Sequence, residues 1–126
     1  MTGPERPPAT LRRDDRLLKS GEFQAVYRTR ARVGDGRLVV YARPNDSGAS
    51  RIGLSVGKRC GNAVRRNRIK RLLREVFRQA RNDLAPGYDL VVVPLGRDYT
   101  LAEVDRRLRV LTPEAIRRAN RKRPDK

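Results

Sequence analysis

The sequence predicts a small α+β protein, an α/β sandwich in which helices pack on a small central sheet. Segments with apolar residues at helical spacing alternate with shorter segments rich in β-branched residues, in the order α-β-β-α-β-α. Of the 126 residues, 37% are hydrophobic and 36% charged, so the core is small and one domain is expected. We expect a flexible basic arm over 1–16, the domain over 17–111 and a basic tail over 112–126.

The first helix is expected to run from Ser20, as its N-cap, to about Arg28. Serine is a preferred N-cap residue because its hydroxyl can accept a hydrogen bond from a free backbone N–H of the first turn. Phe23, Val26 and Tyr27 follow at the i, i+3, i+4 spacing of a single helix face.

Three strands are expected. The segments 37–43 and 51–57 have β-branched or alternating apolar residues and are separated by the turn residues 44–48, so we expect them to pair as an antiparallel hairpin. The segment 88–94 is almost continuously apolar. This pattern is typical of a strand that is buried on both faces, at the centre of a sheet.

The second helix is expected to follow Asn62, a good N-cap, and to be amphipathic. Its apolar stripe consists of Ile69, Leu72, Leu73, Val76, Phe77 and Ala80. From Lys58 to Arg81 there are ten basic residues and one acid, Glu75, a net charge of +9. A solvated helix face normally mixes both signs of charge, so this composition favours a polyanionic ligand.

The last helix is expected to open at Thr100 with the capping box Thr100–Glu103. Leu101, Val104, Leu108 and Leu111 share one face. We expect Pro113 to interrupt this helix, and a short extra helix can start within 112–114.

The charge of the whole chain points to a nucleic acid. The 31 Lys and Arg exceed the 14 Asp and Glu by 17, and 26 of the 31 are Arg, which binds phosphate with a planar fork of donors. The chain has no His and one cysteine, Cys60. This excludes a Ser-His-Asp triad, His metal ligands and an intrachain disulfide. No apolar run is long enough to cross a membrane and no signal peptide is visible, so a cytoplasmic location is expected.

Two places could contact nucleic acid. The loop from Lys58 to Gly61 leads into the basic helix, where backbone amides and basic side chains can bind phosphate together. Phe23, Tyr27 and Tyr41 could line a groove and stack on unpaired bases. Their spacing alone favours the alternative that they are core residues.

The residues around this loop resemble a known family. Gly61-Asn62-Ala63-Val64, then Arg66-Asn67-Arg68 and Lys70-Arg71, closely resemble the signature of the bacterial ribonuclease P protein subunit. The resemblance extends over about 12–111. It implies an α/β sandwich with a left-handed β-α-β crossover, of the type seen in the second domain of a small-subunit ribosomal protein, whereas general rules favour a right-handed one.

The resemblance also implies a function. In that family the RNA subunit is the catalyst and uses Mg²⁺ to remove the 5′ leader from precursor tRNA, while the protein supplies no catalytic residue and no cofactor. The residues implied to contact the RNA subunit are Lys58, Arg59, Asn62, Arg65, Arg66, Asn67, Arg68, Lys70 and Arg71. Those implied to line the cleft for the single-stranded leader are Phe23, Tyr27, Val39, Tyr41, Ser55 and Arg74.

The expected partners are therefore the ribonuclease P RNA and precursor tRNA, with no membrane and no obligate protein partner. Charge and helix pattern fit two alternatives as well: a structural protein that binds ribosomal RNA, and a protein that compacts DNA without sequence preference. Only the signature motif separates the first expectation from these.

Overall fold

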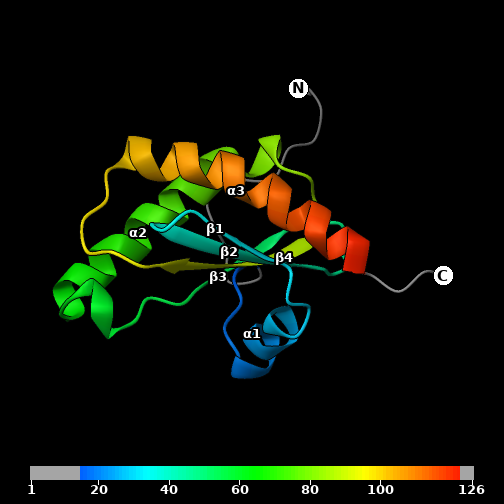
Figure 1. Cartoon of the computed structure of the whole chain (residues 1–126), viewed down its shortest axis with the longest axis horizontal. Coiled ribbons are helices and arrows are strands. Elements are labelled where there is room, and N and C mark those ends of the chain that lie inside the picture. The colour runs from blue at the N-terminus through cyan, green and yellow to red at the C-terminus, as the bar shows by residue number, and fades with distance from the viewer. Residues whose placement is uncertain (1–14, 123–126) are drawn as a thin grey trace, which may run out of the picture.

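The computed structural model describes residues 15–122, and within them it contains one four-stranded sheet with helices on both faces (Figure 1). The predicted arm over 1–16, apart from Asp15 and Arg16, and the last four residues lie outside the described part. The elements are α1 (Ser20–Tyr27), β1 (Arg32–Gly34), β2 (Leu38–Pro44), β3 (Arg51–Leu54), the 3₁₀ turn η2 (Lys58–Cys60), α2 (Ala63–Ala80), the 3₁₀ turn η3 (Arg81–Asp83), β4 (Tyr88–Pro94) and α3 (Leu101–Lys122).

The strand order is β1-β2-β4-β3, and this order corrects the expected hairpin. β2 and β3 do not pair; β4 lies between them, antiparallel to β2 and parallel to β3. The expected central position of the 88–94 strand is confirmed. An apolar strand placed between two others buries both of its faces, and this gain outweighs the local advantage of a hairpin with a long connection.

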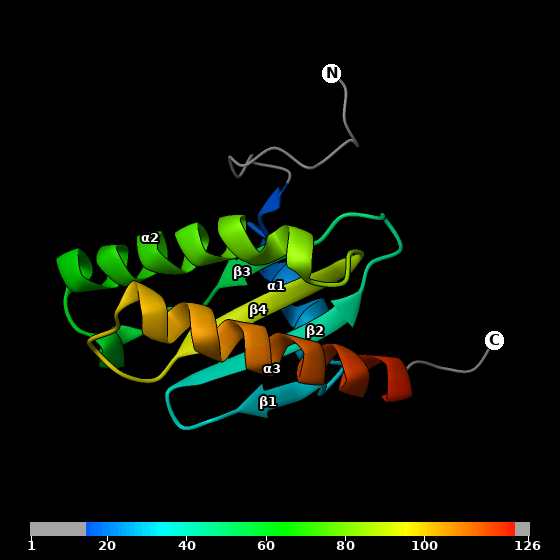
Figure 2. The ribbon, with the colours of Figure 1, turned by 90° about the horizontal axis from the view of Figure 1, so that it is seen from above.

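The α2 helix connects the parallel neighbours β3 and β4. In Figure 2 both strands run from right to left behind α2, and β4 lies below β3, so the crossover is left-handed. The left-handed crossover that the family resemblance implies is confirmed. The general preference for right-handed crossovers does not hold in this sheet.

Strand alternation divides the apolar residues between two cores. Leu38, Val40, Ile52, Leu90 and Val92 face α2 and α3 and form the main core with the buried sides of these helices. On the other face, a smaller cluster joins α1 to the sheet through Leu17, Val26 and Val91. Because α1 has only eight residues, it covers only part of this second face.

The α1 helix begins one residue earlier than expected, with Lys19 rather than Ser20 at the N-cap position. The cause is Glu22, whose carboxylate accepts hydrogen bonds from the backbone N–H of Leu18 and of Lys19, at 2.9 and 3.1 Å. These two bonds lower the pKa of the Glu22 carboxyl.

Strand β1 was not expected from the sequence. It has three residues, of which only Val33 is apolar, and it pairs with β2 from Arg32↔Tyr41 to Gly34↔Val39. The turn that follows is fixed by Asp35, whose carboxylate accepts from the backbone N–H of Arg37 and Leu38. A strand of this length is stabilised by its partner and not by its own residues.

The α3 helix continues through Pro113 to Lys122, which corrects the predicted interruption. A proline inside a helix costs about 3 kcal/mol, whereas burying one large aliphatic side chain contributes about 1.5–3 kcal/mol. Ala115, Ile116 and Ala119 continue the buried face of Leu108 and Leu111, so their burial offsets the proline. The domain therefore includes the first part of the predicted tail over 112–126.

At the start of α3, one of the two hydrogen bonds of the predicted capping box is formed. The Thr100 hydroxyl accepts from the backbone N–H of Glu103 at 3.1 Å. The Glu103 carboxylate instead binds the guanidinium groups of Arg37 at 2.8 Å and Arg107 at 3.0 Å. These ion pairs tie α3 to the first turn of the sheet and lower the pKa of the Glu103 carboxyl.

No helix of residues 15–122 is long and apolar enough to cross a membrane.

Candidate nucleic-acid interface

The loop that precedes α2 is held in place by one buried side chain and by the helix cap. Cys60 has no exposed surface, and its thiol donates to the carbonyl oxygen of Pro94 at 3.5 Å. Burial raises the pKa of this thiol, so it acts as a packing residue and not as a nucleophile. The Asn62 side chain accepts from the backbone N–H of Arg65 at 3.0 Å, which confirms the predicted N-cap. Lys58 and Arg59 are left exposed.

The α2 helix separates an apolar face from a basic face, as expected. Ile69, Leu73, Val76, Phe77 and Ala80 are buried, while Leu72 is half-buried. The nine residues expected to contact the RNA subunit all lie on the surface of the loop and the first half of α2. We call this set the α2 surface: Lys58, Arg59, Asn62, Asn67, Arg68 and Arg71 are exposed, and Arg65, Arg66 and Lys70 are half-buried.

Few acids neutralise the α2 surface. Among the described residues, its ion pairs are limited to the one between Arg65 and Asp98. Glu75 lies one turn beyond and pairs with Arg78, which is not part of the α2 surface. The Nε of Arg66 is buried and has no hydrogen-bond partner within residues 15–122. The exposed guanidinium groups of Arg59, Arg68 and Arg71 form no ion pair within residues 15–122, so they are available to phosphate oxygens.

A hollow of about 410 Å³ lies beside the middle of α2. It is lined by Arg16, Asn67, Arg71, Arg74, Glu75 and Arg78. Burial lowers the pKa of the Arg74 guanidinium, and the charge of Arg16 lowers it further. The Nε of Arg16 is also buried without a partner among the described residues. Sequence reasoning missed Arg16, because nothing in its neighbours distinguishes it from the other charges of the arm.

Residues 16 and 17 connect this hollow to the second face of the sheet. Arg16 forms a parallel bridge with Ile52 of β3, and the N–H of Leu17 donates to the carbonyl oxygen of Ile52 at 2.9 Å. Arg74 lines this hollow together with Arg16. Its place beside the leader cleft stays a prediction.

Phe23, Tyr27 and Tyr41 form an aromatic cluster on the face that α1 covers in part. The ring centroids of Phe23 and Tyr27 are 6.5 Å apart, and those of Tyr27 and Tyr41 are 4.9 Å apart in an edge-to-face arrangement. All three side chains are half-buried against Leu17 and Val91. They thus pack partly against the core, as the core alternative expects, and keep some exposed surface. Stacking on unpaired bases stays a prediction.

The other residues of the predicted cleft differ in exposure. Val39 is buried, with 4% of its surface exposed, so it offers little area to a ligand. Ser55 is half-buried and continues the β3–β4 ladder through its backbone N–H. Gly53 lies directly under Phe23: a Cβ there would stand 2.8 Å from two ring carbons. Glycine at this position lets the ring approach the sheet.

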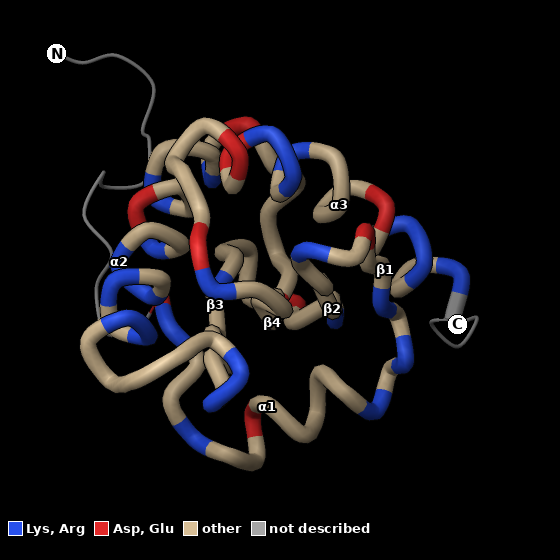
Figure 3. The backbone as a smooth tube through the Cα atoms, turned by 60° about the vertical axis from the view of Figure 1, so that its left-hand side comes forward, with Lys and Arg blue, Asp and Glu red and all other residues tan. Residues whose placement is uncertain are grey.

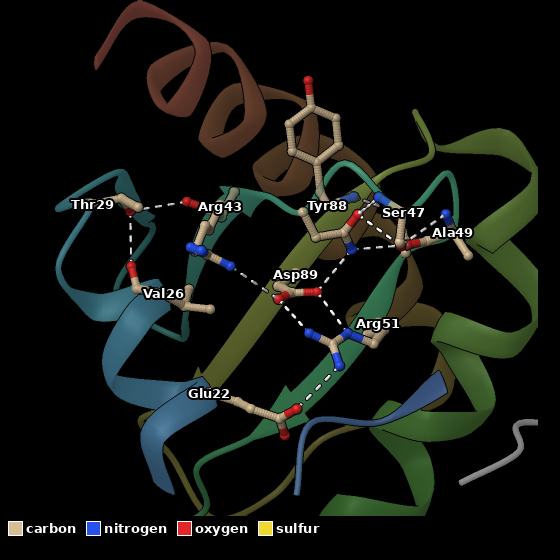
Figure 4. A network of polar contacts seen from close by, with 12 residues as sticks. Glu22, Val26, Thr29, Arg43, Ser47, Ala49, Arg51, Tyr88 and Asp89 are labelled. Atoms are coloured by element: carbon tan, nitrogen blue, oxygen red, sulfur yellow. Dashed lines mark hydrogen bonds and ion pairs between the residues drawn. The ribbon is translucent and has the colours of Figure 1, made fainter. Parts of the chain in front are cut away.

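A polar network missed by sequence reasoning fixes α1 and the strands on this face (Figure 4). Asp89 of β4 is 1% exposed and lies in register with Arg43 of β2 and Arg51 of β3. It accepts from Arg51 Nε and Nη2 at 2.9 and 2.8 Å and from Asn45 Nδ2 at 2.8 Å. Arg51 also donates to Glu22 of α1 at 3.1 Å. The acids and arginines of this network are far apart in the sequence and show no regular spacing. Only the strand order brings them together.

Within residues 15–122, no group of three or more Asp, Glu, Cys or His side chains is placed to hold a metal ion. The described residues form an arginine-rich surface along α2 and a separate aromatic cluster on the opposite face of the sheet. Figure 3 shows the basic residues of α2 on one side of the molecule.

Known proteins resemble this chain over most of its length. The family model described as Ribonuclease P matches residues 11–116. The ribonuclease P protein component of Shouchella clausii is 39% identical over 97 residues, 75% of this chain and 80% of the relative. That of Caldanaerobacter subterraneus is 42% identical over 90 residues, 71% of this chain and 75% of the relative.

Solved structures that resemble this chain are also ribonuclease P proteins. The RNase P protein of Staphylococcus aureus has a TM-score of 0.70 at 32% identity, covering 80% of this chain and 94% of that protein. The RNase P protein of Thermotoga maritima has a TM-score of 0.69 at 29% identity, covering 78% and 96%. The resemblance drawn from the Gly61–Arg71 motif is confirmed, and the chain belongs to the ribonuclease P protein family, the protein subunit of that ribonucleoprotein enzyme.

Proposed function

We propose that this protein binds the catalytic RNA of ribonuclease P through the α2 surface and the single-stranded 5′ leader of precursor tRNA through the aromatic cluster. What supports this function most directly is the physical difference between the two surfaces. The α2 surface offers guanidinium donors with few internal acids, which suits a phosphate backbone. The aromatic cluster offers ring faces, which suit unpaired bases.

In this proposal the RNA subunit hydrolyses the phosphodiester, and Mg²⁺ held by that RNA supplies charge stabilisation. The residues of this chain bind and orient. Stacking of a base on an aromatic side chain contributes about 1–3 kcal/mol and is tolerant of sequence, as a leader without fixed sequence requires. The arginines of the α2 surface neutralise phosphates of the folded RNA, so the assembled enzyme needs less Mg²⁺.

Reconstitution tests the proposed function. Mixing the purified chain with a bacterial ribonuclease P RNA at low Mg²⁺ is expected to stimulate removal of the leader from precursor tRNA, measured by the appearance of mature 5′ ends. The RNA alone at the same Mg²⁺ concentration is the control. If the chain binds this RNA no better than ribosomal RNA and does not stimulate cleavage, the proposed function is wrong.

Replacing Phe23 with alanine is expected to weaken binding of precursor tRNA to the reconstituted enzyme by about tenfold, because one stacked base loses its ring. Binding of mature tRNA should not change. Phe23→Leu is the matched variant: it keeps apolar packing over Gly53 but offers no aromatic face. An equal loss for precursor and mature tRNA, or full affinity in Phe23→Leu, would remove Phe23 from the leader site.

A further inference from the structure

A second group of exposed arginines lies at the β1 edge of the sheet, away from α2. We call it the β1-edge surface. It consists of Arg28 and Arg30 between α1 and β1, of Arg32 at the start of β1, and of Arg117, Arg118 and Arg121 in the last turns of α3. Because the strand order is β1-β2-β4-β3 and α2 packs near β3, this surface and the α2 surface occupy opposite edges of the sheet (Figures 2 and 3).

The two halves of the β1-edge surface are joined directly. A guanidinium nitrogen of Arg118, Nη1, donates to the carbonyl oxygen of Arg32 at 2.9 Å. This contact exists because α3 continues through Pro113 instead of stopping there. The last three arginines lie beyond residue 116, where the match to the family model ends.

The charges of this surface are largely without internal partners. Within residues 15–122, its ion pairs all involve one acid, Glu114, which pairs with Arg117 and Arg118. Arg28, Arg30 and Arg32 form none in that part of the chain. Like charges gathered in this way repel one another, so a polyanion that binds them relieves the repulsion.

Arg30 lies in the turn that ends α1, where its backbone N–H donates to the carbonyl oxygen of Tyr27 at 3.1 Å. Its φ of 57° lies in the left-handed region, which glycine and asparagine adopt more easily than arginine does. The Arg30 side chain is exposed and forms no ion pair within residues 15–122, so its guanidinium is free to bind a ligand.

The β1-edge surface is continuous with the aromatic cluster. The guanidinium carbon of Arg32 lies 5.7 Å from the centroid of the Tyr41 ring, and Tyr41 contacts Tyr27. A single strand stacked on these rings and leading away from α2 passes next over Arg32 and then over its neighbours. Its phosphates would then face the exposed guanidinium groups.

We propose that the β1-edge surface binds the phosphates of the distal part of the single-stranded leader, beyond the nucleotides stacked on the aromatic cluster. This inference rests on the proposed function and extends it, because it makes affinity depend on the length of the leader. It assigns a binding role to the end of α3.

The test compares precursor tRNAs with short and long leaders, of about 4 and about 16 nucleotides, the span of single-strand binding modules. The variant Arg30→Gln/Arg121→Gln is assembled with ribonuclease P RNA, and binding is measured over a series of salt concentrations. The control, Arg97→Gln/Arg106→Gln, removes two exposed arginines outside the β1-edge surface that also lack ion pairs among the described residues.

For the long leader, the variant is expected to bind several-fold more weakly than the wild type. The negative slope of log K against log salt should become less steep by about 1.4, or about 0.7 for each lost contact with a single strand. The short leader should be bound as by the wild type, and the control should match the wild type with both leaders.

Equal behaviour of the variant and the control on the long leader would overturn the inference, as would an equal loss on both leaders. If the wild type prefers a short-leader precursor to mature tRNA but gains nothing from a longer leader, the inference fails alone. If the wild type shows no preference for any leader, the proposed function fails with it.

Discussion

Replacing Asp89 with alanine is expected to lower the free energy of unfolding by about 3–5 kcal/mol, because removal of one partner leaves the other charges of a buried ion pair uncompensated. Asp89 is almost fully buried and accepts three hydrogen bonds from Arg51 and Asn45. Without it, Arg51 keeps only Glu22 as an acidic partner. Domains of this size are stabilised by roughly 5–15 kcal/mol, so the loss is a large part of the total.

Urea unfolding, followed by circular dichroism, measures this effect. Asp98→Ala is the matched control: it also removes one negative charge and one arginine partner, but Asp98 is 87% exposed in its ion pair with Arg65. Exposed ion pairs contribute little, so the control should unfold near the wild-type midpoint. Both variants raise the net charge equally, and self-repulsion therefore cancels in the comparison. Coinciding midpoints would show that the Asp89 network does not stabilise the fold.

The elements that could be predicted from the sequence are those with strong local signals. The α2 helix has an apolar stripe, a basic stripe and a capping Asn62, all within one segment. Strand β4 has a continuous apolar run that places it at the centre of the sheet. In both cases the neighbours in sequence already determine which side chains are buried.

The features that could not be predicted depend on contacts between distant segments. Strand β1 exists because β2 offers it a partner. The α3 helix passes Pro113 because Ile116 and its neighbours find a core to bury in. β2 and β3 are separated because β4 inserts between them after a helical crossover, which no local turn signal reports.

The candidate site likewise has one part that could be predicted from the sequence and one part that could not. The basic residues of α2 are adjacent in sequence, so their common surface follows from helix periodicity. Arg16 and Asp89 become part of the hollow and of the polar network only when residue 16 pairs with Ile52 and when β4 lies between Arg43 and Arg51. The motif resemblance points to α2 and carries no information about these two residues.

Removing two arginines from the α2 surface is expected to have the largest effect on assembly. In Arg68→Gln/Arg71→Gln, both replaced side chains are exposed and form no ion pair within residues 15–122. Each hydrogen bond to a charged group contributes about 1.5–3 kcal/mol, so the double variant should bind ribonuclease P RNA about a hundredfold more weakly, or worse. Glutamine has nearly the helix propensity of arginine, so α2 should stay folded.

Filter binding over a range of salt separates a lost phosphate contact from a general loss of charge. The negative slope of log K against log salt should become less steep by roughly 1.4–1.8 for two lost contacts. Arg30→Gln/Arg121→Gln removes the same charge from exposed positions at the opposite edge of the sheet and should keep the wild-type slope for the RNA subunit. Because α2 and the aromatic cluster lie on opposite faces of the sheet, the preference for precursor over mature tRNA should survive once RNA is added to saturation. A variant that keeps its affinity for the RNA but loses this preference would place the leader, and not the RNA subunit, on α2.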